Sequence, residues 1–413
     1  MNTKPFECRQ EQFGDGEAVS ELYVGSFQER EEELLSAYEG KVQLIYLDPP
    51  FYTGKKFERR IKVRSSDDTL VPLSVLAYED KWESQEAYLE MIRSALVLCR
   101  RLLRPDGTLF LHCDARTSPL QRMLMDEVFG EELFLNEIIW VYQSGGRAKR
   151  FFSRKHDTIL FYANSPSYFF NLKAVPIGVA MNRNNHMKRG VDEDGRVYRS
   201  IVSGGKEYRY YDEEKVYPSD VWDDISHLQQ KDPERTGMET QKPLKLLDRI
   251  VRCASREGDL VCDLFMGSGT SMVAAAQLGR RFVGTDQAPL ALSMTDRRLW
   301  NLDRPYRIAA RTLVDASSAQ VVYWTTIISF TVTLSDFECP QSLEAGLKGL
   351  DAIDAWSAGY LKGDTYIRRV NAVRGRDGRL PHSLELPVDE GVPCIMVVDI
   401  WGNRRCFQAV REL

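Results

Sequence analysis

Buried strands and amphipathic helices alternate along most of this chain, and that order limits the fold more than any other feature. Residues 41–48, KVQLIYLD, form a continuous apolar run typical of a strand buried on both faces of a parallel sheet. A helical pattern follows at 84–107, closed by Pro-Asp-Gly, and TLFLHCD at 108–114 is a second buried strand. The same order returns between residues 243 and 286. The sequence therefore predicts a doubly wound α/β fold with a mostly parallel sheet.

Two other regions depart from this pattern. Residues 141–235 are rich in Tyr, Arg, Asn and Gly, and we expect them to interrupt the sheet without extending it, as a loop-rich functional insertion. Residues 313–413 contain strand-like runs around a short helical patch, which predicts a small β-rich domain. Residues 1–140 and 236–312 then make up the α/β domain.

Composition narrows the class of protein. No apolar run is long enough to span a membrane, and the first residues lack the apolar core of a signal peptide, so we expect a cytoplasmic protein without membrane contact. The eight cysteines are scattered without metal-ligand spacing, which predicts reduced thiols and no metal site. The net charge of −5 means that contact with nucleic acid would need local basic patches.

The stretch LIYLDPPFYTG, residues 44–54, ends a buried strand with an acid, two prolines and an aromatic residue. A strand stop needs only one proline, because proline already fixes its own φ and ends ladder pairing. The second proline indicates a stiff turn that places Asp48 and Phe51 for a purpose besides folding.

The stretch DLFMGSGTSMVAAAQLGRRFVGTD holds a second candidate site at the end of another strand. Gly267 and Gly269 predict a tight turn into a helix whose first N–H groups face a ligand, and Asp286 ends the next strand, where a carboxylate can accept from ribose hydroxyls. The third glycine of a dinucleotide fingerprint is absent, since Met272 stands there, and the chain has no phosphate loop. A nucleoside ligand without a pyrophosphate fits this crevice better.

Together these stretches resemble the β class of DNA amino-methyltransferases, the modification enzymes of restriction-modification systems, over residues 1–310. The pieces that match, in family order, are DPPFYTG, RLLRPDGTLFLHCD, DEVFGEELFLNEIIW, VWDDI, TQKP and DLFMGSGT. The resemblance implies the seven-stranded type of sheet, S-adenosylmethionine as cofactor and double-stranded DNA as partner. It implies a cofactor site at Asp263, Phe265, Gly267, Ser268, Gly269, Thr270, Asp286, Thr240, Lys242, Pro243 and Asp15.

The resemblance also implies catalysis by the DPPF segment. An exocyclic amine is a poor nucleophile because its lone pair is delocalised, and acceptors on its N–H bonds favour the reactive geometry. Asp48 and a carbonyl near Pro49 are the expected acceptors, held by the turn that Pro49 and Pro50 make. Phe51 is expected to stack on a base rotated out of the duplex. Two local readings stay open: Thr240 also fits a helix N-cap, and His112 with Asp114 fits either pocket lining or a packed polar pair.

Basic residues in the insertion are the candidate DNA contacts. The segment SGGRAKRFFSRKHD interleaves basic and aromatic side chains, which suits phosphate contact and stacking, although a solvated loop has the same charge pattern. The segment MNRNNHMKRG carries side chains suited to base edges in the major groove. The expected DNA-binding residues are Arg147, Lys149, Arg150, Arg154, Lys155, Arg183, Asn185 and Arg189.

Three functions fit the sequence. An adenine-N6 methyltransferase is favoured, because relatives with Asp before Pro-Pro-Phe are more often adenine enzymes. A cytosine-N4 methyltransferase, or an enzyme that acts on RNA or a protein amide, is the second. A catalytically silent DNA-binding subunit is the third, which the intact Asp48 and glycine turn argue against. A homodimer and a restriction-system partner are the assemblies that the resemblance suggests.

Overall fold

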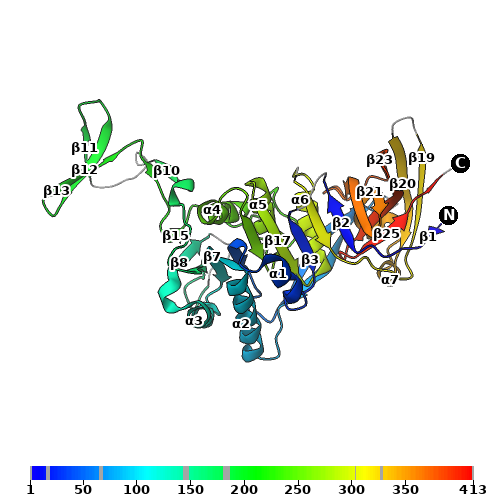
Figure 1. Ribbon diagram of the computed structural model, residues 1–413, viewed down its shortest axis with the longest axis horizontal. Coiled ribbons are helices and arrows are strands. Elements are labelled where there is room, and N and C mark those ends of the chain that lie inside the picture. The colour runs from blue at the N-terminus through cyan, green and yellow to red at the C-terminus, as the bar shows by residue number, and fades with distance from the viewer. Residues whose placement is uncertain are drawn as a thin grey trace.

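The computed structural model describes residues 2–14, 19–64, 68–142, 148–179, 187–302, 304–325 and 329–411. Three parts follow one another along its longest axis (Figure 1): a small projecting sheet, a central body of helices on a sheet, and a β-rich end that carries both termini. None of the described helices is long and apolar enough to cross a membrane.

The centre of the body is a run of parallel strands within a fourteen-stranded sheet. In spatial order they are β7 (Leu103–Cys113), β4 (Val42–Leu47), β16 (Leu260–Asp263), β17 (Arg281–Asp286), β3 (Glu21–Val24) and β18 (Tyr306–Ala309). Every residue of β4 is buried, which explains its unbroken apolar sequence.

Helices cover both faces of this sheet. They are α1 (Glu31–Tyr38), α2 (Gln85–Leu102) and α3 (Ser118–Phe129) on one face, and α4 (Leu244–Ala254), α5 (Thr270–Gln277) and α6 (Pro289–Leu299) on the other. Alternate residues of β4 divide between the two cores, because successive strand side chains point to opposite faces. This is the doubly wound α/β fold that the sequence predicted.

One predicted helix boundary is wrong. Ser84 caps α2 by accepting from the Ala87 backbone N–H at 3.2 Å, as a helix start should. The helix ends at Leu102, and β7 begins at the next residue, so the expected stop at 105–107 lies inside a strand. Strand pairing with β4 sets the end of the helix, because Leu103 is already paired with Val42 in the sheet.

The segment 141–235 does extend the sheet, contrary to expectation. β9 (His156–Ala163) pairs antiparallel with β7, β8 (Phe134–Val141) with β9, and β15 (Val221–Trp222) parallel with β8. Beyond η2 (Leu172–Ala174), a stem of β10 (Gly178–Val179) and β14 (Lys215–Val216) leads to an antiparallel sheet, the arm, made of β11 (Lys188–Val191), β12 (Val197–Ser203) and β13 (Lys206–Tyr211). The arm projects from the body (Figure 1).

The C-terminal region is β-rich, as predicted, and it prolongs the central sheet. After β18 come β2 (Gln10–Phe13), β22 (Thr365–Val373), β21 (Ile353–Lys362), β24 (Val392–Asp399) and β25 (Arg404–Gln408). A five-stranded sheet packs against these strands: β1 (Asn2–Thr3), β19 (Ser318–Thr325), β20 (Ser329–Glu338), β23 (Ser383–Pro387) and β26 (Val410–Arg411). The remaining elements are η1 (Glu131–Leu133), α7 (Pro340–Glu344), η4 (Gly349–Ala352) and a hairpin of β5 (Lys56–Arg64) and β6 (Leu70–Glu79).

Candidate active site

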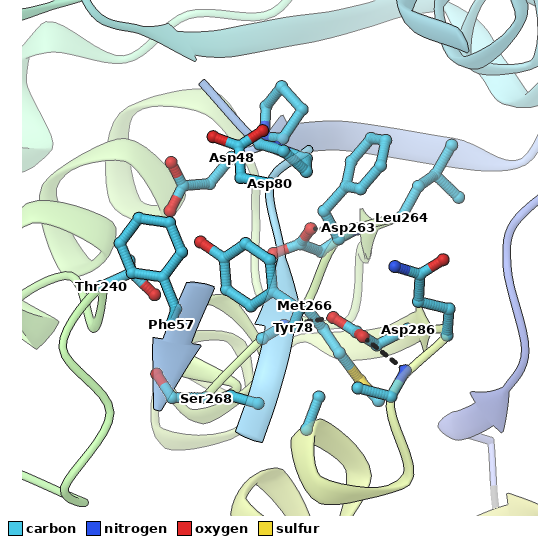
Figure 2. A pocket seen from close by; sticks show the side chains of 18 of the residues that line it. Asp48, Phe57, Tyr78, Asp80, Thr240, Asp263, Leu264, Met266, Ser268 and Asp286 are labelled. Carbon is cyan, nitrogen blue, oxygen red and sulfur yellow. Dashed lines mark hydrogen bonds between the residues drawn. The ribbon is translucent and has the colours of Figure 1, made fainter. Parts of the chain in front are cut away.

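A cavity of about 510 Å³ opens at the carboxyl ends of β4, β16 and β17. Asp48 lies at one end of the group in Figure 2 and Asp286 at the other, with Asp263 and Met266 between them. Ligands of open α/β sheets bind at this edge, where the loops after parallel strands converge. The two stretches that the sequence singled out, 48–51 and 263–270, therefore line one cavity.

Asp80, which the sequence did not single out, holds the DPPF loop in place. Its buried carboxylate accepts from the backbone N–H groups of Phe51 at 3.2 Å, Tyr52 at 3.2 Å and Thr53 at 2.7 Å. The Trp82 indole N–H donates to the same carboxylate at 3.0 Å. A carboxylate that accepts from successive backbone N–H groups fixes their directions, so Asp80 sets where Phe51 points.

Backbone geometry adds to the stiffness of this loop. Tyr52 has a φ of +56°, a conformation that non-glycine residues adopt only when their surroundings hold them there. The Tyr88 hydroxyl donates to the Pro50 carbonyl at 2.9 Å. This hydrogen bond ties the loop to α2.

Lys242, which the resemblance places at the cofactor, lines the cavity and pairs with Asp48. Its ammonium donates to the two Asp48 carboxylate oxygens at 2.8 and 2.6 Å, with both side chains largely buried. The same nitrogen lies 5.1 Å from the centre of the Phe51 ring. Lys242 thus joins the Asp48 carboxylate to the aromatic ring. The two residues are 194 positions apart, so no local pattern could have revealed the pair.

A buried polar chain stands behind Phe51. The Phe51 ring stacks on the His112 ring with centroids 5.9 Å apart and an interplanar angle of 21°. His112 contacts the Tyr46 hydroxyl through Nδ1 at 3.0 Å and the Asp157 carboxylate through Nε2 at 3.1 Å. Of the two readings left open, the packed polar one holds for His112, which does not line the cavity. Asp114 pairs with Arg116 rather than with His112.

The glycine turn shapes the other half of the cavity. Gly267 and Gly269 have φ values of +49° and +74°. A Cβ at Gly267 would meet no side chain within 4 Å, whereas a Cβ at Gly269 would lie 2.4 Å from the Thr295 hydroxyl oxygen. Gly267 therefore leaves room for a ligand, and Gly269 allows the turn to approach α6. Phe265, Ser268 and Thr270 line the cavity, as expected of cofactor-binding residues.

The two strand-end acids have different surroundings. Asp263 is buried and accepts from the Phe265 backbone N–H at 2.9 Å and from the Ser271 hydroxyl, and its burial raises its pKa to about 7. Asp286 is only partly buried and accepts from the backbone N–H groups of Gly267 at 3.0 Å and Ala288 at 2.9 Å. Burial raises the pKa of Asp286 as well. Asp263 mainly organises the turn, while Asp286 keeps a carboxylate edge toward the cavity.

The TQKP segment reaches the cavity from the start of α4. Thr240 and Lys242 line it. The helix begins at Leu244 with Pro243 in the capping position, so the reading of Thr240 as N-cap is wrong. The Thr270 hydroxyl donates to the Lys242 carbonyl at 3.0 Å, which ties this segment to the glycine turn.

Comparison with known proteins agrees with this geometry. Residues 42–295, more than half of the chain, match the family model N6_N4_Mtase, described as DNA methylase. The chain belongs to this DNA methylase family. The matched range contains Asp48, Asp263 and Asp286, and every residue that lines the cavity except Ser26, Phe27 and Gln28.

Individual relatives are distant. The Type II methyltransferase M.EcaI of Enterobacter cloacae is 28% identical over 304 residues, which cover 62% of this methylase and 64% of that relative, less than two thirds of its length. The DNA adenine methyltransferase YhdJ of Escherichia coli (strain K12) is 26% identical over 260 residues, covering 62% and 76% of the two chains. The solved M1.HpyAVI–SAM complex is 16% identical with a TM-score of 0.42, covering 68% and 98%.

The expected DNA contacts that fall within the described residues do not line the cavity. Lys149, Arg150, Arg154 and Lys155 lie in the loop between β8 and β9. β8 pairs antiparallel with β9, and β9 antiparallel with β7, so β8 runs in the direction of β7 and β4. The loop after β8 therefore leaves at the sheet edge where Asp48 lies.

The other expected DNA contacts are less informative about the site. Arg189 is on the arm, where it contacts the Asp212 carboxylate at 3.4 Å. Asp15, Arg147, Arg183 and Asn185 lie outside the described residues.

Proposed function

We propose that this methylase transfers a methyl group from S-adenosylmethionine to the exocyclic N6 amine of adenine in a nucleotide rotated out of double-stranded DNA. One observation carries the proposal: the Asp48 carboxylate paired with Lys242, the stiff Pro49–Pro50 turn and the Phe51 ring share a cavity with the glycine turn and Asp286. An amine acceptor and a nucleoside crevice thus lie within reach of one another.

The cavity suits the cofactor. Its volume of about 510 Å³ lies within the range of sites for small molecules and cofactors. Gly267 leaves open space at the turn, and the Asp286 carboxylate provides an acceptor for ribose hydroxyls. The residues that would hold the cofactor are Phe265, Gly267, Ser268, Thr270, Asp286 and Thr240. When bound, S-adenosylmethionine supplies an electrophilic methyl group.

The chain's own residues prepare the amine. The Asp48 carboxylate and the Pro49 carbonyl accept hydrogen bonds from the two N–H groups of the amine. These hydrogen bonds concentrate the lone pair on the amine nitrogen. Lys242 holds the Asp48 carboxylate in place by donating to both of its oxygens. Phe51, supported by His112, offers a ring face that offsets part of the stacking energy that a base gives up when it leaves the duplex.

Adenine is the proposed target for two reasons. Asp48 heads the Pro-Pro-Phe motif, and in the family that the sequence resembles Asp is commoner there in adenine enzymes and Ser in cytosine-N4 enzymes. The E. coli relative is a DNA adenine methyltransferase. Cytosine N4 is chemically the nearest alternative, because it too is an exocyclic amine next to a ring nitrogen. The target base is therefore the quantity to measure.

Identification of the methylated base tests the proposal. The purified protein is incubated with unmethylated genomic DNA and methyl-labelled S-adenosylmethionine, and the DNA is digested to nucleosides. We expect the label in N6-methyldeoxyadenosine. Label in N4-methyldeoxycytidine would contradict adenine specificity, and no label in DNA of varied sequence would favour a silent DNA-binding subunit.

A further inference from the structure

The β5–β6 hairpin forms a wall of the cavity. Its open end contributes Phe57, Ala77, Tyr78 and Glu79 to the lining. Phe57 and Tyr78 face each other across the two strands and stack with ring centroids 4.9 Å apart and an interplanar angle of 21°. Figure 2 shows this aromatic pair beside Thr240 and opposite Asp263. The position of the hairpin therefore sets the width of the cavity.

A lone two-stranded hairpin is at best marginally stable in water, so its position must come from packing. Ile61 and Val63 of β5 and Val75 of β6 are buried in a cluster with Met294 of α6. The cluster also contains Ile400 of the C-terminal region, and Trp401 packs against it. The C-terminal region thus contacts the hairpin although it lies outside the family match of residues 42–295.

A buried ion pair fastens the hairpin to this region. The Arg59 guanidinium donates to both Asp354 carboxylate oxygens, at 2.9 and 3.1 Å, and the two side chains are 3% and 2% exposed. Arg297 of α6 donates to the same carboxylate at 3.2 Å. A bidentate pair of this kind fixes direction as well as distance. Asp354 therefore joins the hairpin, α6 and β21 at one point.

A second contact reaches the cavity from the C-terminal region. Gly402 has a φ of +89°, and a Cβ there would lie 2.4 Å from the Leu290 backbone nitrogen. Leu290 is in the first turn of α6, between Ala288 and Ala291, which both line the cavity. Two faces of the cavity are thus held by the same region.

We propose that the C-terminal β region braces the cofactor cavity, and that Arg59, through Asp354, is a positioning residue for S-adenosylmethionine. This inference rests on the proposed function. Without the ion pair, the hairpin keeps its strand pairing but loses its fixed place, so Phe57 and Tyr78 no longer close the wall. Cofactor binding must then also order the hairpin, and this free-energy cost lowers the affinity for S-adenosylmethionine.

Substitution Arg59→Met in the full-length protein is the central test. Asp354 keeps Arg297 as a partner, so no buried charge is left alone. We expect the Kd of S-adenosylmethionine to rise tenfold or more by calorimetry. The KM for the cofactor should rise in parallel, while kcat at saturating cofactor changes less than threefold. Hydrogen exchange should accelerate in residues 56–64 and 70–79.

Two controls separate positioning from general stability. Arg60→Met removes the neighbouring arginine of β5, whose side chain is 73% exposed and pairs with Glu239, and it should leave the Kd unchanged. Val332→Ala opens a cavity in the separate hydrophobic core of the C-terminal region, and it should lower the Tm while the Kd stays within error of the wild type. Arg59→Lys keeps the charge and should give an intermediate Kd.

The outcomes are distinct. A folded Arg59→Met protein with the wild-type Kd would overturn the inference, as would an equal loss of affinity in Val332→Ala. If Arg59→Met does not fold, a wild-type Kd for Arg59→Lys together with unchanged exchange in the hairpin would overturn it as well. A wild-type protein that binds no S-adenosylmethionine would instead overturn the proposed function.

Discussion

Asp48 and Lys242 show how much of the site depends on a single contact between residues. The ion pair directs the carboxylate toward the cavity, and its two distances of 2.8 and 2.6 Å leave Asp48 little rotational freedom. A side chain held in this way needs no reorganisation when a target amine arrives, which is the main advantage of a preorganised polar site.

Substitution Asp48→Asn should therefore abolish most methyl transfer. The amide keeps the shape of the side chain but presents an N–H group to an amine that needs an acceptor. We expect kcat to fall by at least about a hundredfold, in the range found for loss of one preorganised polar group. The Kd of S-adenosylmethionine by calorimetry should stay within about tenfold. Loss of cofactor binding would instead place Asp48 in the cofactor site.

Asp263 gives a prediction about pH. Burial raises its pKa to about 7 from the ordinary 3.8, so the folded protein holds this proton more tightly than the unfolded chain. Its contribution to stability is then full below pH 3.8 and is lost as the pH rises toward 7. Between pH 5 and 7 the free energy of unfolding of the wild type should fall by about 2 kcal/mol relative to Asp263→Asn. Urea titrations of both proteins at several pH values measure this, and parallel pH profiles would contradict it.

At the scale of elements, the carboxyl ends of the parallel strands decide where chemistry takes place. The motifs after β4 and β16 could be predicted from the sequence, because each combines a buried apolar run with turn residues. Both signals depend only on neighbouring residues. The end of α2 was not readable, because strand pairing between Val42 and Leu103 overrides the Pro-Asp-Gly stop. The extension of the sheet by β9 and β15 was missed for a similar reason, since edge pairing depends on distant partners.

The two glycines of the turn should respond differently to substitution, because Gly267 borders the cavity and Gly269 packs against α6. Gly267→Ala should weaken cofactor binding and cost about 1 kcal/mol of stability, because its Cβ points into open space but its φ of +49° is unfavourable. Gly269→Ala should lower the Tm much more, since its Cβ would meet Thr295. Calorimetry with S-adenosylmethionine and thermal unfolding of both variants test this. Equal losses of stability would contradict the assignment.

The loop between β8 and β9 should contact DNA phosphates. Lys149 and Arg150 are exposed in it, and replacing both with Ala should weaken binding to all duplexes alike. The slope of log affinity against log salt should fall by up to about two units, near 0.9 for each phosphate that is no longer neutralised. Anisotropy at four salt concentrations measures the slope, and Lys173→Ala, which removes an exposed lysine of η2, is the control. A change in sequence preference instead would indicate that this loop reads bases.

At the scale of the whole molecule, the arm projects from the body, whereas the C-terminal region continues the central sheet of the body. The arm stands out at one end of Figure 1 on the stem of β10 and β14. The C-terminal strands share the central sheet through β2 and β22. We propose three functional regions: 1–140 together with 236–312, 141–235, and 313–413. All three regions contribute strands to the same fourteen-stranded sheet.

Replacing residues 188–212 with a short Gly/Ser linker should therefore spare the catalytic body. Arg189 and Asp212, near the two ends of the excised segment, contact each other at 3.4 Å, so a short linker can join these ends. We expect the Tm and the Kd of S-adenosylmethionine to remain within error of the wild type, while the affinity for DNA falls. A loss of cofactor binding would show that the arm supports the cavity, and an unchanged DNA affinity would move recognition elsewhere.

The sequence by itself determined the doubly wound order of strands and helices, the DPPF loop after one strand and the glycine turn after another. These depend on residue periodicity and turn chemistry, which act over a few neighbouring positions. Only the tertiary structure decided that Lys242 holds Asp48 and that Arg59 and Asp354, 295 positions apart, fasten the cavity wall. Such pairs arise where the fold brings distant charges together, and no short stretch of sequence records that meeting.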